Sequence, residues 1–288
     1  MPSKSIPLAI AYDFDGTLAP GNMQEHSFIP NLGMTTKNFW EKVKTHSTRH
    51  DMDEILAYMD LMIHEADLKG EKINEQAFKD HGKKLPLFEG VENWFKRINQ
   101  YGKTKKINIS HFIISSGLRE MIKGTLISKE FDYIFASGFR YEQHGVARWP
   151  ALAMNYTTKT QCLFRINKGI NNSYDNRLIN SFLPESSRPI PFTNMIYIGD
   201  GETDIPCMKI IKDKGGHSIA VYDPKKRKTI NKDSPKEKCM TLLKQQRASY
   251  ISPADYSENK KLDKLIKAII DNIATESNLS KMKKTLNS

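Results

Sequence analysis

One stretch near the start of the chain, residues 8–18, constrains the fold more than any other; it reads Leu-Ala-Ile-Ala-Tyr-Asp-Phe-Asp-Gly-Thr-Leu. Its mostly apolar first part, residues 8–12, predicts a buried strand because it is short and bounded. The strand ends in two carboxylates, Asp13 and Asp15, whose side chains point the same way in an extended chain. Open α/β sheets bind ligands at the carboxyl ends of their strands, so we expect an α/β fold with a site here.

The two carboxylates indicate a bound cation. Carboxylates this close repel each other unless a cation or a shared proton relieves the repulsion. Hard carboxylate oxygens suit Mg²⁺, and Gly16 lets the backbone turn sharply and approach a bound group closely. We therefore predict a magnesium site at Asp13 and Asp15. The alternative is an acidic strand end that only caps a helix.

A second apolar run, residues 195–198, leads into the sequence Gly-Asp-Gly-Glu-Thr-Asp. Its aspartates, Asp200 and Asp204, lie four positions apart. We expect Asp200 to face the same sheet edge as Asp13. Asp204 is expected at the start of the next helix, where a carboxylate interacts favourably with the helix dipole.

Two further segments carry groups that suit a phosphate. The predicted strand at 111–114 ends in Ser115, Ser116 and Gly117, which are expected to open a helix from residue 118 onward. The free N–H groups of a helix start bind phosphate, although Ser115 could instead be a plain N-cap. In the predicted helix 157–168, Lys159 opposes the helix dipole, which a nearby anion would explain. Lys168 competes for this role, but a lysine is favourable at a helix C-terminus.

The remaining pattern completes an α/β chain. We expect strands at 133–136 and 217–221, a hairpin over 139–147, a short helical piece near 178–182 within a polar surface excursion at 171–194, and helices at 92–101 and 262–273. The final dozen residues are polar, and we expect them to fray.

Residues 22–86 are mostly helical in pattern and show no run of strands. We predict a helical domain at 21–85 inserted into a core formed by residues 1–20 and 86–288. Such a domain above the strand edge would act as a lid that excludes water. The alternative is that these helices continue the core.

Together, the Asp13–Leu18 segment, Ser115, Lys159 and the Gly199–Asp204 segment resemble, in order, the four motifs of the haloacid dehalogenase superfamily, a group of mainly phosphoryl-transfer enzymes. The layout is most similar to the phosphoserine phosphatase-like branch. The resemblance implies a three-layer, Rossmann-like core with a parallel sheet and a helical cap between the first and second motifs.

The resemblance also implies a role for each residue. Asp13 would attack phosphorus and form an aspartyl-phosphate, while Asp15 would protonate the leaving oxygen and lend its backbone carbonyl to Mg²⁺. Asp200 would be a metal ligand, and Asp204 would hold either Lys159 or the water around the metal. The roles at the second and third motifs are phosphate binding by Ser115, Ser116 and Gly117, and charge neutralisation by Lys159.

The resemblance favours a magnesium-dependent phosphatase of small phosphorylated metabolites, since the superfamily's dehalogenases lack a carboxylate at the position of Asp15. In the phosphoserine phosphatase branch a glutamate after the first motif reads the amino group; this chain has Asn22 at that offset and Glu25 nearby. Phosphoserine itself therefore stays open. A phosphotransferase or mutase shares every motif and is the alternative.

The net charge of +11 raises the question of nucleic-acid binding. Residues 225–288 hold 16 Lys and Arg against 7 Asp and Glu, so the basic excess follows the last motif. We interpret it as a solvated surface and disfavour a non-catalytic nucleic-acid-binding protein. Three cysteines without metal-type spacing, no apolar run long enough for a membrane span and no room for a signal peptide predict a cytoplasmic protein. The oligomeric state stays open.

Overall fold

The computed structural model describes residues 5–226 and 233–286, and within these ranges seven strands form one sheet in the order β4-β3-β2-β1-β5-β6-β7. All neighbouring pairs run parallel except β3 and β4, which are antiparallel. The predicted α/β class with a parallel sheet is confirmed. The strands are β1 Ile6–Tyr12, β2 Ile107–Leu118, β3 Tyr133–Tyr141, β4 Ala147–Leu152, β5 Met195–Gly199, β6 His217–Tyr222 and β7 Tyr250–Pro253.

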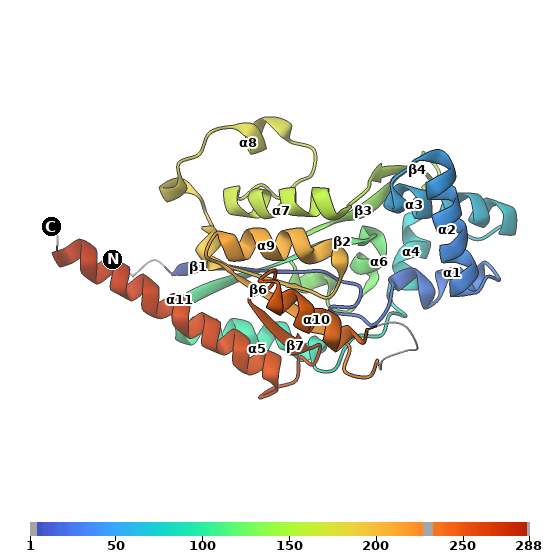
Figure 1. Cartoon of the computed structure of the whole chain (residues 1–288). Coiled ribbons are helices and arrows are strands. Elements are labelled where there is room, and N and C mark those ends of the chain that lie inside the picture. Colours follow the sequence, from blue (N-terminus) through green and yellow to red (C-terminus); the bar gives the residue numbers. More distant parts are fainter. Residues whose placement is uncertain (1–4, 227–232, 287–288) are drawn as a thin grey trace.

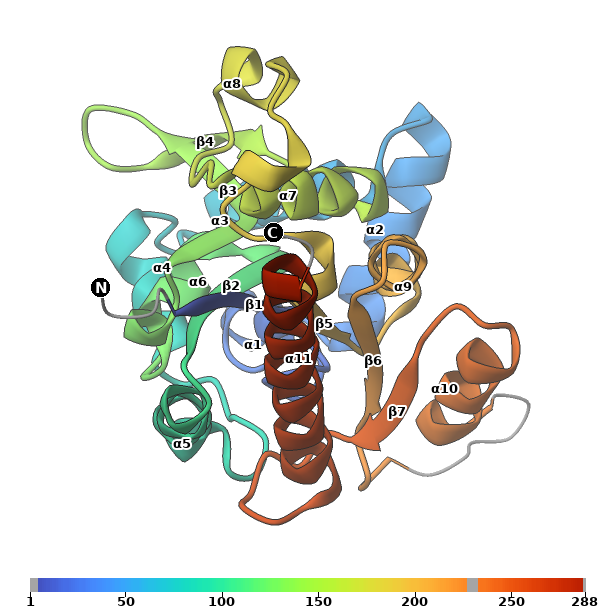
Figure 2. The ribbon, with the colours of Figure 1, turned by 90° about the vertical axis from the view of Figure 1, so that its left-hand side faces the viewer.

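Helices cover both faces of the sheet and make it the middle of three layers (Figures 1 and 2). Side chains alternate between the faces of β1: Leu8, Ile10 and Tyr12 join one core, which includes side chains of α5 (Val91–Thr104) and α11 (Lys261–Leu286). Ala9 and Ala11 join a second core with α7 (Tyr156–Lys168) and α9 (Ile205–Asp213). In Figure 2, α7 lies above the strands and α5 below them.

The segment between β1 and α5 is helical, as its pattern predicts. Its helices are α1 Phe28–Asn31, α2 Thr36–His50, α3 Glu54–Lys69 and α4 Glu75–Gly82. Helices α2 and α3 pack against each other, while α4 packs against α6 (Arg119–Gly124). Figure 1 shows these helices at the end of the molecule toward which β1 runs. The division into a core and a cap at residues 21–85 stays a prediction.

Several elements differ from the sequence prediction. Strand β2 continues to Leu118, so the helix that follows begins only at Arg119 and is six residues long. The strand predicted at 133–136 and the first arm of the hairpin form one strand, β3. Helix α8 covers Asn176–Asn180, two residues earlier than expected. Helix α10 (Pro235–Lys244) and strand β7 were not predicted.

The final dozen residues are helical as far as the structure describes them, because α11 continues to Leu286; their fraying stays a prediction. The first turns of this helix are packed on the core through Leu262 and Ile266. Once a helix is nucleated, each further residue adds one hydrogen bond at little cost. The packed start therefore allows the polar end to remain helical. In the described part of the chain, none of the helices has the length and apolar content that crossing a bilayer requires.

Candidate active site

The acids of the first and fourth motifs meet because β1 and β5 are neighbours. Asp13 follows the end of β1, and its backbone N–H donates to the carbonyl of Ile198 in β5 at 2.9 Å. Asp200 follows the end of β5. Asp13, Asp200 and Asp204 each place a carboxylate oxygen within 4.8 Å of the others. Residues almost 190 positions apart in the chain thus share one site.

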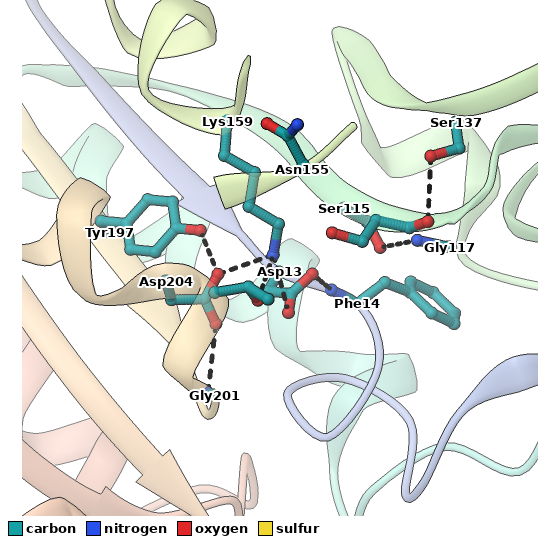
Figure 3. A network of polar contacts seen from close by, with 12 residues as sticks. Asp13, Phe14, Ser115, Gly117, Ser137, Asn155, Lys159, Tyr197, Gly201 and Asp204 are labelled. Carbon is teal, nitrogen blue, oxygen red and sulfur yellow. Dashed lines mark hydrogen bonds and ion pairs between the residues drawn. The ribbon is translucent and has the colours of Figure 1, made fainter. Parts of the chain in front are cut away.

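Lys159 extends from the start of α7 into this acidic group (Figure 3). Its side chain is fully buried, and Nζ lies 3.1 Å from Asp13 Oδ2 and 2.7 Å from Asp204 Oδ1. Asn155 caps the helix by accepting from the N–H groups of Thr157 and Thr158, which fixes where the lysine enters.

Lys168, the competing lysine, lies at the other end of α7 and does not reach the site. Its Nζ donates to the carbonyls of Ile179 and Ser181 at 2.6 Å and 2.7 Å. These bonds hold the excursion at 171–194 against the helix. Of the two lysines considered, the structure therefore brings only Lys159 to the acids.

Asp204 is buried and surrounded by donors. Besides Lys159, the hydroxyl of Tyr197 donates to Oδ1 at 2.6 Å, and the N–H of Gly201 donates to Oδ2 at 3.2 Å (Figure 3). Tyr197 was not singled out in the sequence, where it is one residue of an apolar strand. Its place on β5, facing α7 and α9, is what brings its hydroxyl to Asp204.

Gly16 forms the turn after the two aspartates. Its φ is +71°, and a Cβ there would meet Asp200 Oδ2 at 2.0 Å, so both conformation and space require glycine. Next to it, the carboxyl of Asp15 accepts from the N–H of Met23 at 3.0 Å through Oδ1. The glycine turn thus leaves room for Asp200, and the N–H of Met23 holds the carboxyl of Asp15.

The last residues of β2, Ser115 to Gly117, border the same cleft. Ser115 is fully buried, and its Oγ accepts from the N–H of Gly117 at 3.0 Å. The carbonyl of Ser116 accepts from the hydroxyls of Tyr58 at 2.7 Å and Ser137 at 3.0 Å. The plain N-cap alternative for Ser115 is excluded, since Leu118 is the N-cap residue of α6.

Negative charge exceeds positive charge in this group. Burial and the charge of Asp204 raise the pKa of Asp13 to about 7, against the lowering effect of Lys159. Burial and then the charge of Asp13 also hold the pKa values of Asp15 and Asp200 well above their usual range. Burial alone would lower the pKa of Lys159, but Asp13 and Asp204 outweigh it and raise the pKa. A divalent cation would relieve this crowding of carboxylates.

A cleft of about 580 Å³ opens above these residues. Its floor includes Asp13, Asp15, Ser115 and Asp200, and its far wall comes from η1 (Met23–Glu25), α2 and α3. Sequence reasoning singled out two of the wall residues, Asn22 and Glu25, but not the others, which include Gln24, Trp40, Lys44, Glu54, Ile55 and Tyr58.

One wall residue is held in a defined position. Glu25 Oε1 accepts from Asn22 Nδ2 and from Trp40 Nε1, both at 2.7 Å. Asn22 stands at the position where the phosphoserine phosphatase branch has a glutamate. Glu25, a few residues later, thus lies in the cleft beside it. A carboxylate is therefore available on this side of the cleft.

A parallel α/β sheet with aspartates at the ends of two neighbouring strands, a buried lysine and a hydroxyl-rich third strand end defines a hydrolase of the haloacid dehalogenase type. The family model described as haloacid dehalogenase-like hydrolase matches residues 10–209, and the chain belongs to this family. The family membership expected from the motifs is confirmed.

The chain is also similar to a further protein in sequence and to solved structures in fold. An uncharacterized protein of Borreliella burgdorferi is 29% identical over 242 residues, which cover 75% of this chain and 83% of that protein. A haloacid dehalogenase family hydrolase from Salmonella enterica serovar Typhi superposes with a TM-score of 0.56 at 16% identity, over 93% of this chain and 72% of that one. A substrate-bound phosphoserine phosphatase has a TM-score of 0.54 at 16% identity, over 91% and 98% of the two chains. At these identities the two structures establish the fold.

Proposed function

We propose that this protein is a magnesium-dependent phosphatase that hydrolyses small phosphorylated metabolites through an aspartyl-phosphate on Asp13. One observation carries the proposal: the carboxylate of Asp13 lies in an open cleft, 3.1 Å from the buried amine of Lys159, with Asp15 two positions on. A nucleophilic carboxylate, a fixed cation and a second acid are the groups that phosphoryl transfer through a covalent intermediate requires.

The nucleophile is oriented from two sides. Asp13 Oδ1 accepts from the N–H of Phe14 at 2.8 Å, and Oδ2 faces Lys159. Lys159 in this proposal neutralises charge on the nucleophile and on the phosphoryl oxygens. Asp15, fixed by the N–H of Met23, protonates the leaving oxygen and then takes a proton from the attacking water. Ser115 and the N–H groups near it hold phosphoryl oxygens.

The donors present fit Mg²⁺. Three carboxylates within 4.8 Å of one another offer the hard oxygens that this ion prefers. We assign Asp13, Asp200 and the backbone carbonyl of Asp15 as its ligands. Asp204 already accepts from Lys159, Tyr197 and Gly201, so we assign it the positioning of Lys159. When bound, the ion would neutralise charge that develops on the phosphoryl group.

Two further points belong to the proposal. The cleft has carboxyl groups at its floor, and Glu25 supplies a carboxylate on its wall, so amino-bearing phosphate esters such as phosphoserine belong in a substrate screen. All three cysteines, Cys162, Cys207 and Cys239, are free and buried, which supports a reducing compartment such as the cytoplasm.

The test compares wild type with Asp13→Asn on p-nitrophenyl phosphate in the presence of MgCl₂. We expect the variant to lose at least about three orders of magnitude in kcat, because the nucleophile is absent, and to retain its circular-dichroism spectrum. Asp213→Asn, on the exposed surface of α9, is the matched control and should turn over normally. Retained turnover in Asp13→Asn would contradict the assignment.

Two additions define the reaction. Chelation by EDTA should abolish turnover, and added Mg²⁺ should restore it. A competing alcohol acceptor separates hydrolysis from phosphotransfer, because a phosphotransferase would yield the phosphorylated alcohol rather than inorganic phosphate. A screen of phosphorylated metabolites with the wild-type protein then identifies the substrate.

A further inference from the structure

A second cavity, of about 480 Å³, lies between α4, α6 and β3 and shares no lining residue with the catalytic cleft. Charged and hydroxyl side chains line it together with aromatic and aliphatic ones. None of the four family motifs contributes to it. A cavity of this size accommodates a small metabolite.

Two buried polar atoms at this cavity lack partners. Glu120 is 3% exposed; its Oε1 accepts from Arg119 Nη2 at 3.3 Å, whereas Oε2 has no hydrogen-bond partner among the residues that the structure describes. The hydroxyl of Tyr141, another lining residue, is likewise buried and has no partner at ordinary hydrogen-bond distance within the described ranges, and the carboxyl of Glu120 is its polar neighbour. Buried polar groups are nearly always paired, because leaving one unpaired is destabilising. Because the two oxygens neighbour each other at one cavity, a single group that donates hydrogen bonds can satisfy both.

Opposite charges stand side by side in the same lining. Arg119 and Lys123 come from α6 and supply cations, and Arg119 remains 27% exposed. Glu120 supplies a carboxyl group whose Oε1 pairs with Arg119 and whose Oε2 has no partner among the described residues. The apolar part of the lining includes Ile134 and the fully packed ring of Phe139. The lining can thus recognise a cationic group, an anionic group and an apolar substituent at once.

We propose that this cavity binds a small zwitterion of the free amino acid class. Its ammonium group donates to Glu120 Oε2 and to the oxygen of Tyr141, and its carboxylate faces Arg119 and Lys123. The side chain of the ligand packs toward Ile134. This binding site does not depend on the function proposed for the cleft.

Its position joins the helical insertion to the core. Helix α4 approaches α6 so closely that a Cβ on Gly124 would meet the carbonyl of Lys79 at 2.0 Å. On the other side, Arg119 follows Gly117 of the cleft by two positions. A ligand in this cavity contacts α4 of the insertion and α6 of the core without entering the catalytic cleft. Such a position suits a regulatory site.

The test is calorimetric titration of the full-length protein with each of the twenty L-amino acids in turn. We expect at least one to bind saturably, with one site per chain. Glu120→Gln should bind it about 10- to 100-fold more weakly, because a charged hydrogen bond is lost. Asp13→Asn should bind it as wild type does, which separates this cavity from the cleft. Glu130→Gln, an exposed carboxyl of the neighbouring η2 (Ser128–Glu130), is the matched control and should not change affinity.

The thermal midpoint of the unliganded protein separates a binding role from a structural one. If Glu120 is kept for a ligand, Glu120→Gln keeps or raises this midpoint and loses the increase that the amino acid produces in wild type. Tyr141→Phe removes the second unpartnered oxygen and repeats the test should the first variant not fold. The proposal is overturned if none of the twenty compounds binds saturably, or if both variants bind as tightly as wild type.

Discussion

Replacement of Lys159 by methionine tests the electrostatic core of the site most directly. Methionine is close to the lysine side chain in length and apolar volume, so the change removes the charge and leaves the packing of α7 largely intact. In the wild-type protein the buried amine compensates two buried carboxylates, at 3.1 Å from Asp13 and 2.7 Å from Asp204. In the variant these carboxylates remain, without their cation.

The expected loss of stability is large. Removing one partner of a buried ion pair costs about 3–5 kcal/mol, because the remaining charge is left uncompensated. For a chain of this size each kcal/mol lowers the midpoint of thermal unfolding by roughly 2–3 °C, so the variant should unfold about 6–15 °C below wild type. Turnover of p-nitrophenyl phosphate should fall by at least about three orders of magnitude, since phosphoryl charge is no longer neutralised.

Unfolding is followed by calorimetry in EDTA, so that bound metal does not compensate the carboxylates. Lys168→Met is the matched control: it changes the same residue type in the same helix, where Nζ bonds only backbone carbonyls in the described structure. We expect this control to lose at most about 1 kcal/mol and to keep its activity.

A double variant, Lys159→Met with Asp204→Asn, adds a second check. Removing one carboxylate relieves the uncompensated charge, so the double variant should be more stable than the sum of the two single losses predicts. The reasoning is refuted if Lys159→Met unfolds within about 1 kcal/mol of wild type, or if the two substitutions are additive.

Three further predictions concern the turn, the metal and the last helix. Gly16→Ala should abolish turnover because the added Cβ overlaps Asp200. Gly33→Ala is the control: its φ is a similar +70°, but no atom lies within 4 Å of the added Cβ, so it should cost about 1–2 kcal/mol of stability and keep activity. Equal effects of the two substitutions on turnover would contradict the steric argument. Asp200→Asn should raise the half-saturating Mg²⁺ concentration by more than about tenfold, and an unchanged magnesium titration would remove Asp200 from the ligand set. Burial alone would raise the pKa of Asp263, but hydrogen bonds from Lys267, Asn259 and Arg97 outweigh the effect of burial and lower the pKa. The ionised carboxylate therefore stabilises the fold above pH 4, and this contribution is lost as the pH falls. Asp263→Asn should cost about 1.5–3 kcal/mol at pH 7 and less at pH 3 in urea unfolding, and a pH-independent loss would exclude the ionic contribution.

The central strands were predictable because each ends in chemically distinctive residues. An apolar run that ends in Asp13 and Asp15, or in Asp200, marks both a buried strand and the edge at which it stops. Strand β7 offers no such signal. It is four residues long, Tyr250–Pro253, and is recognisable only from its pairing with β6.

In the candidate site, too, the sequence identified only residues that stand in a chemically distinctive local pattern. Lys159 was preferred to Lys168 from its place at a helix start, and the structure adds the burial and the distances that the sequence lacks. Tyr197 was missed because an aromatic residue in an apolar strand is typical of a core, and its hydroxyl has meaning only once Asp204 is placed beside it. The unpartnered oxygen of Glu120 is a property of packing that no local pattern contains.

Two hydrogen bonds at α3 also bear on how the predicted lid could work. Asn155, which caps α7 and so positions Lys159, donates through Nδ2 to Asp53 at 3.0 Å, and Asp53 is itself the N-cap of α3. Tyr58 of α3 donates to the carbonyl of Ser116, in the segment to which we assign phosphate binding. If α2 and α3 move as a lid, opening must break both bonds, each worth about 1 kcal/mol. The same motion that admits substrate would therefore loosen the residues that position Lys159 and the phosphate, and closure would restore them together.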